Sequence, residues 1–169
     1  TQIITVKKKY KENQRITASN RHLGRIVALQ TLYEYEFRTE SHDNSDDAKE
    51  ILSRNLERYE TAIDDTKFVE SLVTGVLKEQ KAIDEKIQPI APDWPIEQIA
   101  RVDRNILRLG MYELLHQSEI VPPKVAINEA VELAKAFGSD NSSKFVNGVL
   151  GTAYRTLVEG AENGSTTVR

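Results

Sequence analysis

The chain contains no cysteine among its 169 residues, and this absence excludes several kinds of site at once. Without thiols there is no disulfide framework, no zinc ribbon and no cysteine nucleophile. Aromatic residues make up only 7% of the chain, with a single Trp and a single Met. The sequence therefore offers few chemically distinctive side chains on which a function could depend.

Long apolar runs are also missing. No stretch approaches the roughly 20 consecutive apolar residues that a membrane-spanning helix needs. The short apolar segment Ile3–Val6 is followed by basic residues rather than preceded by them, which is not the order found in a secretory signal. We therefore expect no membrane association and a cytoplasmic location.

Histidine is equally scarce, and His22, His42 and His116 stand far apart in the chain. None of them has ligand spacing with another His or with a pair of carboxylates, so we expect no metal site. The chain also lacks GxGxxG, the P-loop and the GxSxG nucleophile motif. These absences predict a protein that is not an enzyme and that holds no cofactor.

Charged residues make up 29% of the chain and hydrophobic residues 39%, which is typical of a globular protein. No stretch alternates apolar and polar residues as a strand does, whereas apolar residues repeatedly recur at helical spacing. One such stripe is Ile26, Leu29, Tyr33 and Phe37. The pattern predicts an all-α fold, a bundle of about seven helices.

The distribution of prolines and polar residues predicts how the bundle is divided. Residues 1–16 are basic and show no helical period, so we expect a flexible arm, followed by a helix that starts near Thr17–Asn20. We expect an all-helical domain over residues 17–158, with sub-bundles at about 17–88 and 95–158. The Gly- and Ser-rich residues 159–169 should form a disordered tail.

Three prolines and the single Trp mark the expected junction between the two sub-bundles. Pro95 should open a short helix, and Trp94 should act as a packing anchor where the sub-bundles meet. Asp103 is placed to cap the next helix. Gly110 in the middle of that helix costs about 1 kcal/mol relative to Ala, which indicates a close helix crossing.

The charge is distributed unevenly along the chain. Residues 1–25 hold seven Lys or Arg against one acid, a net charge of +6, so the net charge of −3 leaves −9 for the rest. Such asymmetry favours a polyanion partner, with a solvated tail as the alternative. Arg21 and Arg25 lie near the predicted start of the first helix, where cations oppose the helix dipole. A local conflict of this kind often marks a functional residue.

The region from Pro122 onward predicts two helices with a short corner between them. Gly138 should end the first helix as a left-handed C-cap, and Ser139–Ser142 offer N-cap oxygens for the second. Lys144 and Phe145 then lie at the start of the second helix. A cation and an aromatic ring beside a helix N-terminus suit phosphate binding and base stacking. The alternative is that Phe145 belongs to the core and Lys144 is merely solvated.

Four segments resemble the NusB family of bacterial transcription antitermination factors, and the resemblance covers roughly residues 20 to 158. These segments are Ala28–Tyr33, Arg104–Leu114, Val125–Phe137 and Phe145–Leu150. The resemblance implies a two-part helical bundle. It also implies binding of boxA-type single-stranded RNA together with NusE, a small-subunit ribosomal protein. The complex would promote read-through on ribosomal RNA operons and contact the RNA polymerase elongation complex indirectly.

The resemblance also implies which residues form the binding surfaces. The RNA-binding residues would be Arg21, His22, Arg25, Gln30, Asn141, Lys144 and Phe145. The partner-binding residues would be Tyr33 and Asp103. Members of the family commonly have a denser Arg cluster, and here His22 and Leu23 stand where further Arg would be usual. Whether the basic arm Lys7–Lys11 compensates is left open.

Two alternatives have a different biological role. The chain could be the NusB-like RNA-binding domain of a ribosomal RNA cytosine methyltransferase, in which case the reading frame would continue beyond Arg169 into a catalytic domain. It could also be a homodimeric helical interaction protein without an RNA role.

Overall fold

The computed structural model describes the backbone of residues 2–59 and 62–161, with side chains from residue 20 onward within those ranges. The regular elements are α1 (Gln2–Glu40), α2 (Ala48–Glu57), α3 (Thr66–Ile87), the 3₁₀ turn η1 (Ile96–Gln98), α4 (Arg101–His116), α5 (Pro123–Phe137), α6 (Ser142–Ala153) and the π-helix η2 (Tyr154–Glu159).

The all-α prediction is confirmed, because no strand occurs in the described parts of the chain. Those parts contain six α-helices rather than about seven, since the short helix expected at Pro95 is the single 3₁₀ turn η1. Within the same residues, no helix combines the length and the apolar character that a bilayer span requires.

Helix α1 begins at Gln2, so the expected helix start near Thr17–Asn20 is wrong. Lys, Glu, Gln and Arg dominate residues 7–15, all of them good helix formers, and neither Gly nor Pro interrupts the chain before Gly24. Arg21 and Arg25 therefore lie within a helix, and the argument from the helix dipole does not apply to them. At the other end, Glu159–Ala161 are helical, and residues 162–169 of the expected tail lie outside the described residues.

The chain divides into two compact units, Thr1–Val73 and Thr74–Arg169. The division falls inside α3, whereas we expected it at the prolines between Pro89 and Pro95. No proline interrupts the 22 residues of α3, so this helix continues across the division. The prolines from Pro89 onward follow the end of α3 and do not separate the two units. Each unit is described below by itself.

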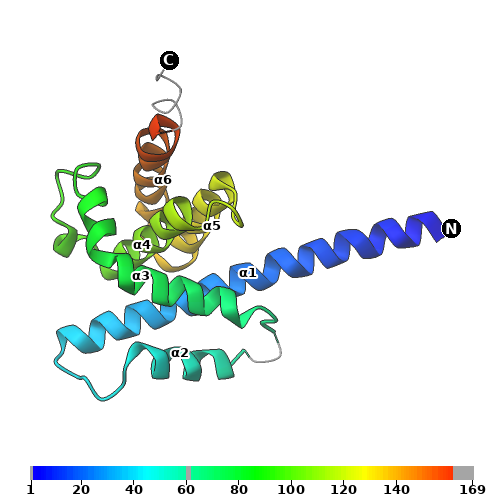
Figure 1. Cartoon of the computed structure of the whole chain (residues 1–169), viewed down its shortest axis with the longest axis horizontal. Helices are drawn as coiled ribbons and strands as arrows, with labels where there is room; N and C mark the ends of the chain where they lie inside the picture. Colours follow the sequence, from blue (N-terminus) through cyan, green and yellow to red (C-terminus); the bar gives the residue numbers. More distant parts are fainter. Residues whose placement is uncertain (1, 60–61, 162–169) are drawn as a thin grey trace. The chain divides into compact units, whose positions relative to one another are not determined.

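In the first unit, α1 and α2 lie side by side and are joined by the loop 41–47 (Figure 1). Asp47 caps α2, because its side chain accepts a hydrogen bond from the backbone N–H of Glu50. Asn55 Nδ2 donates to Thr31 Oγ1 at 3.1 Å, and both residues are buried. In the adjacent loop, the hydrogen bond from Arg54 lowers the pKa of the Asp46 carboxyl.

The buried face of α1 is not the one that the apolar stripe predicted. Val27, Ala28 and Leu32 are buried, and polar Thr31 is buried with them. Of the predicted stripe only Leu29 is buried, whereas Tyr33 is 37% and Phe37 51% exposed. Aliphatic residues together with Thr31 therefore form the packed side of α1, and the aromatic side chains of Tyr33 and Phe37 face outward.

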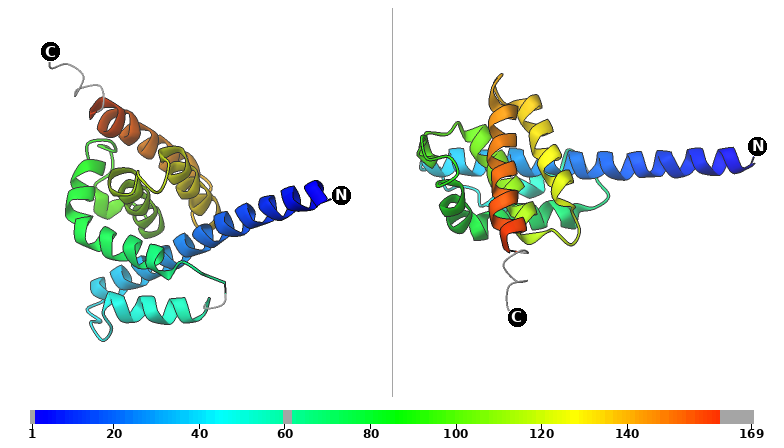
Figure 2. Two further views of the ribbon diagram at one scale, coloured as in Figure 1. Left: turned by 45° about the vertical axis from the view of Figure 1, so that its right-hand side comes forward. Right: turned by 90° about the horizontal axis from the view of Figure 1, so that it is seen from above.

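In the second unit, α4, α5 and α6 pack against one another (Figure 2). A Cβ added to Gly110 would lie 2.6 Å from Leu150 Cδ1 and 3.4 Å from Ala130 Cβ. The close helix crossing predicted at Gly110 is thus confirmed. The largest side chains buried in this unit are Ile83, Ile87, Ile106, Leu107, Leu109, Met111, Leu133 and Leu150.

Two arginines of α4 form hydrogen bonds with α3 and with the segment around η1. Arg108 donates through Nε and Nη2 to the two carboxylate oxygens of Asp84 on α3, at 2.9 and 2.8 Å. Arg104 Nη1 donates to the backbone carbonyl oxygens of Ile96, Glu97 and Ile99 at 3.1–3.2 Å. Because these carbonyls belong to η1 and its flank, Arg104 fixes the segment that leads from α3 into α4.

Two predicted helix caps are wrong. Gly138 ends α5 with φ −89° and ψ −171°, which is extended rather than left-handed backbone. A Cβ at this position would lie 2.5 Å from Ser142 Oγ, so glycine is needed there for space. Asp103 does not cap α4, because the N-cap is Ala100 and Asp103 lies within the first turn.

Candidate nucleic-acid interface

The first group of predicted RNA-binding residues lies on α1 in the first unit. The guanidinium carbons of Arg21 and Arg25 lie 5.1 and 5.2 Å from the centroid of the Phe68 ring, within the range of a cation–π contact. Asp65 Oδ1 accepts a hydrogen bond from the backbone N–H of Phe68, which fixes the ring at the start of α3. One buried ring therefore positions both arginines.

The two arginines differ in accessibility. Arg25 is only 2% exposed, whereas Arg21 and the neighbouring His22 are half-buried. A buried guanidinium is poorly placed to reach a phosphate, so Arg25 is better suited to supporting Phe68 and Arg21 than to contacting RNA. Sequence spacing alone does not separate the two side chains, because both lie on the same side of α1.

Gln30 lies elsewhere on α1. Nine residues separate it from Arg21, which is about two and a half helical turns and places the two on opposite sides of the helix. Gln30 is exposed and shares its side with Tyr33 and Phe37. An exposed aromatic pair suits a protein partner better than a phosphate backbone, which agrees with the partner-binding role predicted for Tyr33.

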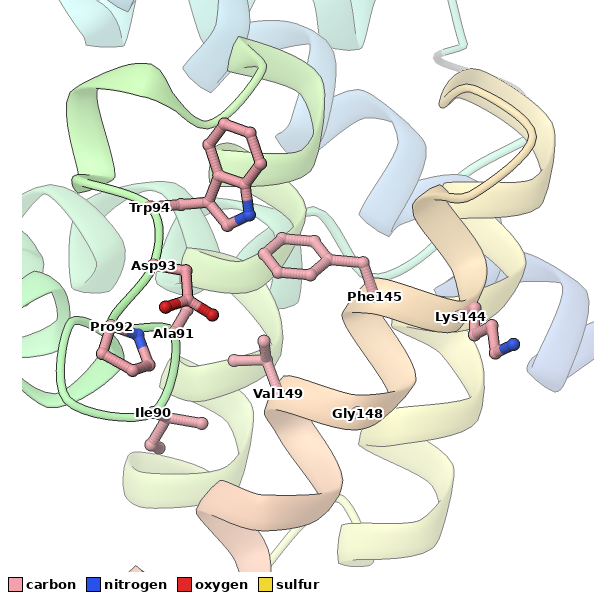
Figure 3. A pocket seen from close by; sticks show the side chains of 9 residues that line it. All are labelled: Ile90, Ala91, Pro92, Asp93, Trp94, Lys144, Phe145, Gly148 and Val149. Atoms are coloured by element: carbon pink, nitrogen blue, oxygen red, sulfur yellow. The ribbon is translucent and has the colours of Figure 1, made fainter.

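The second group lies at the start of α6 in the second unit. Lys144 and Asn141 are exposed, and Phe145 is half-buried and does not belong to the core. Figure 3 shows the Phe145 ring reaching from α6 toward the loop that carries Asp93 and Trp94. The cation, the amide and the ring therefore all lie at the start of α6, but the Lys144 side chain points away from the Phe145 ring.

Two hollows flank the Phe145 ring. The first has a volume of about 330 Å³ and is lined by Ile90, Ala91, Pro92, Asp93, Trp94, Lys144, Phe145, Gly148 and Val149 (Figure 3). The second has a volume of about 300 Å³ and is lined by Trp94, Gln98, Ile99, Ala100, Asp103, Ser139, Asn141, Ser142 and Phe145. Asp103, predicted to bind a protein partner, therefore shares a hollow with two predicted RNA-binding residues.

Trp94 is the residue of this site that the sequence interpretation placed wrongly. It was expected to be a packing anchor, but its side chain is 56% exposed and lines both hollows. Gln88 holds the backbone around it, donating to the carbonyl of Trp94 at 2.9 Å and accepting from the N–H of Ile96 at 3.0 Å. The prolines on either side of Trp94 were a signal of a rigid loop, but they did not show which way the ring faces.

The chemistry available at the hollows is that of binding. Asp103 lines the second hollow, and its Oδ1 is buried without a hydrogen-bond partner among the described atoms. In the described part of the chain, no group of three or more His, Asp or Glu residues could hold a metal ion. Two aromatic rings, amides, a carboxylate and a rim lysine suit a planar polar ligand.

Comparisons with known proteins identify the family of the chain. The NusB family model matches residues 22–155. The transcription antitermination protein NusB of Dehalococcoides mccartyi (strain CBDB1) is 40% identical over 143 residues, which is 85% of this chain and 95% of that protein.

Solved structures of the same kind match as well. A structure of T. maritima NusB has a TM-score of 0.70 and 32% identity, covering 80% of this chain and 90% of that one. A crystal structure of the antitermination factors NusB and NusE in complex with double-stranded RNA has a TM-score of 0.66 and 26% identity, covering 84% and 98%. The family is one of transcription factors and not of enzymes. The chain therefore belongs to the NusB family.

Proposed function

We propose that this chain is a transcription antitermination factor that binds boxA-type single-stranded RNA together with the ribosomal protein NusE. In this role it promotes read-through on ribosomal RNA operons. The observation that supports the RNA role most directly is the grouping of Asn141, Lys144 and Phe145 around the hollows at the start of α6. A similar protein has been crystallised with NusE and double-stranded RNA, which supports NusE and RNA as the two classes of partner.

Each predicted residue has a role that fits its exposure. Lys144 is exposed and contacts a phosphate, and the half-buried ring of Phe145 stacks on a base. Asn141 hydrogen-bonds a base edge or a sugar. On α1, Arg21 and His22 contact the backbone of the strand, and Arg25 positions Arg21 through Phe68. Gln30 contacts the RNA or the protein partner that covers the side of α1 carrying Tyr33 and Phe37.

The partner protein covers the acidic part of the chain. A net charge of −9 beyond residue 25 favours a basic partner such as a ribosomal protein. Tyr33 supplies an exposed aromatic contact, and Asp103 supplies a carboxylate at the second hollow. Contact with the RNA polymerase elongation complex is indirect, through these partners. Formation of a homodimer would compete for the same exposed surfaces, and the site of action is the cytoplasm.

The methyltransferase-domain alternative receives less support. The curated relative from Dehalococcoides mccartyi is matched over 95% of its length and is named as an antitermination protein. No residue pattern in the chain favours a catalytic role over a binding role.

Charge removal tests the RNA role. Lys144→Gln and Arg21→Gln should each weaken binding of boxA-type RNA and reduce the slope of log affinity against log salt by about 0.7. Lys135→Gln is the matched control, because the exposed Lys135 side chain on α5 pairs with Glu132 and lies outside both hollows. The measurement is a filter-binding titration at several salt concentrations.

Equal affinities and equal salt slopes for the two variants and the control would exclude these residues from the RNA surface. Tighter binding of the corresponding RNA duplex than of the single strand would contradict the choice of ligand.

A further inference from the structure

Gly148 has no structural reason to be glycine. A glycine inside a helix costs roughly 0.5–1 kcal/mol of stability relative to alanine. At Gly110 the neighbouring Leu150 side chain explains the choice, but a Cβ added to Gly148 would meet no atom within 4 Å. Gly148 therefore leaves a bare patch of α6 backbone, and this patch lines the first hollow.

The same hollow is lined by an exposed ring on a loop whose backbone is held in place. Trp94 is the most exposed of the large apolar side chains in the described residues, at 56%. Its backbone carbonyl is fixed by Gln88, and the following turn is fixed by Arg104. The loop therefore presents the exposed Trp94 ring on a fixed backbone, where the ring is available to stack on a base.

The hollow is also lined by one group of each charge, Asp93 on the loop and Lys144 on α6. In Figure 3, the Asp93 carboxylate lies on the loop side of the hollow, and the Lys144 side chain extends from α6 away from the Phe145 ring, so the lysine belongs to the outer rim. A phosphate is attracted to the lysine and repelled by the carboxylate. The carboxylate in turn can accept a hydrogen bond from the exocyclic amine of a base.

We propose that this hollow is a slot for one unstacked nucleotide of the bound RNA. The base lies between the Trp94 loop and the Phe145 ring, the phosphate lies toward Lys144, and Gly148 provides room for the sugar to approach the α6 backbone. The inference rests on the proposed RNA role and adds Trp94 and Gly148 to the binding surface.

Gly148→Ala tests the slot, because it should have opposite effects on stability and on binding. The variant should unfold at a higher temperature than the original chain, and it should bind boxA-type single-stranded RNA about three- to tenfold more weakly. Gly151→Ala is the matched control, since Gly151 lies one turn further along α6 and outside the hollow. It should leave RNA affinity unchanged.

Trp94→Ala gives a second, independent measurement on an exposed loop. It should weaken RNA binding by about 5- to 100-fold, the loss expected for one base–aromatic stack, and Trp94→Phe should recover part of that loss. Ile120→Ala, at a side chain that is 53% exposed and outside the hollow, is the control. RNA affinity is measured by fluorescence anisotropy and NusE affinity by calorimetry.

Unchanged RNA affinity for Gly148→Ala and Trp94→Ala, with the original chain binding RNA normally, would overturn the slot and leave the proposed function standing. Weakened NusE binding with normal RNA binding would assign the hollow to the protein partner instead, which also overturns the slot. Failure of the original chain to bind RNA at all would overturn the proposed function itself.

Discussion

Arg21 and Arg25 carry the same chemistry and contact the same ring, but only Arg25 is buried. Removal of a buried side chain loses its packing as well as its charge. We therefore expect Arg25→Ala to lower the free energy of unfolding by about 1–3 kcal/mol and Arg21→Ala to change it by less than about 1 kcal/mol. Urea denaturation of both variants measures this difference.

Arg25→Met keeps most of the aliphatic stem of the arginine and serves as the control. It should recover part of the stability that Arg25→Ala loses. Equal destabilisation by Arg21→Ala and Arg25→Ala would show that burial does not distinguish the two residues.

Phe145 is the residue for which the sequence left two interpretations open. Because the side chain is half-buried, Phe145→Ala should cost less stability than the roughly 3–5 kcal/mol of a fully buried phenylalanine. Loss of a stacking ring should at the same time cost about 1–3 kcal/mol of RNA affinity. A urea melt and an RNA titration on this one variant decide between the interpretations. A full core-sized loss of stability with normal RNA affinity would return Phe145 to the core.

Several single residues could not be placed from the sequence. Gly138 was expected to be left-handed because glycines often end helices in that way, but the crowding that requires it comes from Ser142 and Ala134. The path of the loop around Trp94 depends on Gln88, whose side chain forms hydrogen bonds with three backbone groups, those of Ala91, Trp94 and Ile96. Both features depend on contacts that spacing does not reveal.

Among the helices, α1 shows most clearly where periodicity misleads. The apolar stripe that includes Tyr33 and Phe37 was expected to mark the packed side of α1, but both residues are exposed and Thr31 and Arg25 are buried. A binding surface and a core both produce apolar residues at helical spacing, so the pattern alone does not tell which side is covered. In α4 the close crossing predicted at Gly110 is present, but residues 104–111 are all buried, so burial does not distinguish one side of this helix from another.

The ion pair between Asp84 on α3 and Arg108 on α4 allows a test of how these two helices are held together. The Arg108 side chain is only 5% exposed, so Asp84→Asn would leave a buried cation without its bidentate acceptor. We expect a loss of roughly 3 kcal/mol in the free energy of unfolding. Glu85→Gln, at the exposed neighbouring position, removes one carboxylate without this contact and should change stability by less than about 0.5 kcal/mol. Similar losses for both variants would show that the ion pair contributes nothing specific.

For the molecule as a whole, the sequence predicted the all-α class, the family and the two helices after Pro122, because amphipathic periodicity and contiguous motifs can be recognised without knowledge of tertiary contacts. It did not predict the two hollows, since their walls come from the loop after α3 and from the start of α6, some 50 residues later. Nor did it predict that Asp103 would lie in the same hollow as Asn141 and Phe145. The sequence indicated these residues one by one, and only the folded structure shows that Asp103, Asn141 and Phe145 line the same hollow.

Joint binding of RNA and NusE is the most direct test of the proposed function. A fluorescence anisotropy titration of boxA-type single-stranded RNA with this chain, in the absence and presence of saturating NusE, measures the coupling between the two partners. We expect NusE to tighten RNA binding by at least about fivefold, and RNA to tighten NusE binding by the same factor, because coupling free energies are reciprocal. NusE alone and a shuffled RNA strand are the controls. The same RNA affinity with and without NusE, or equal affinity for the shuffled strand, would contradict the proposed function.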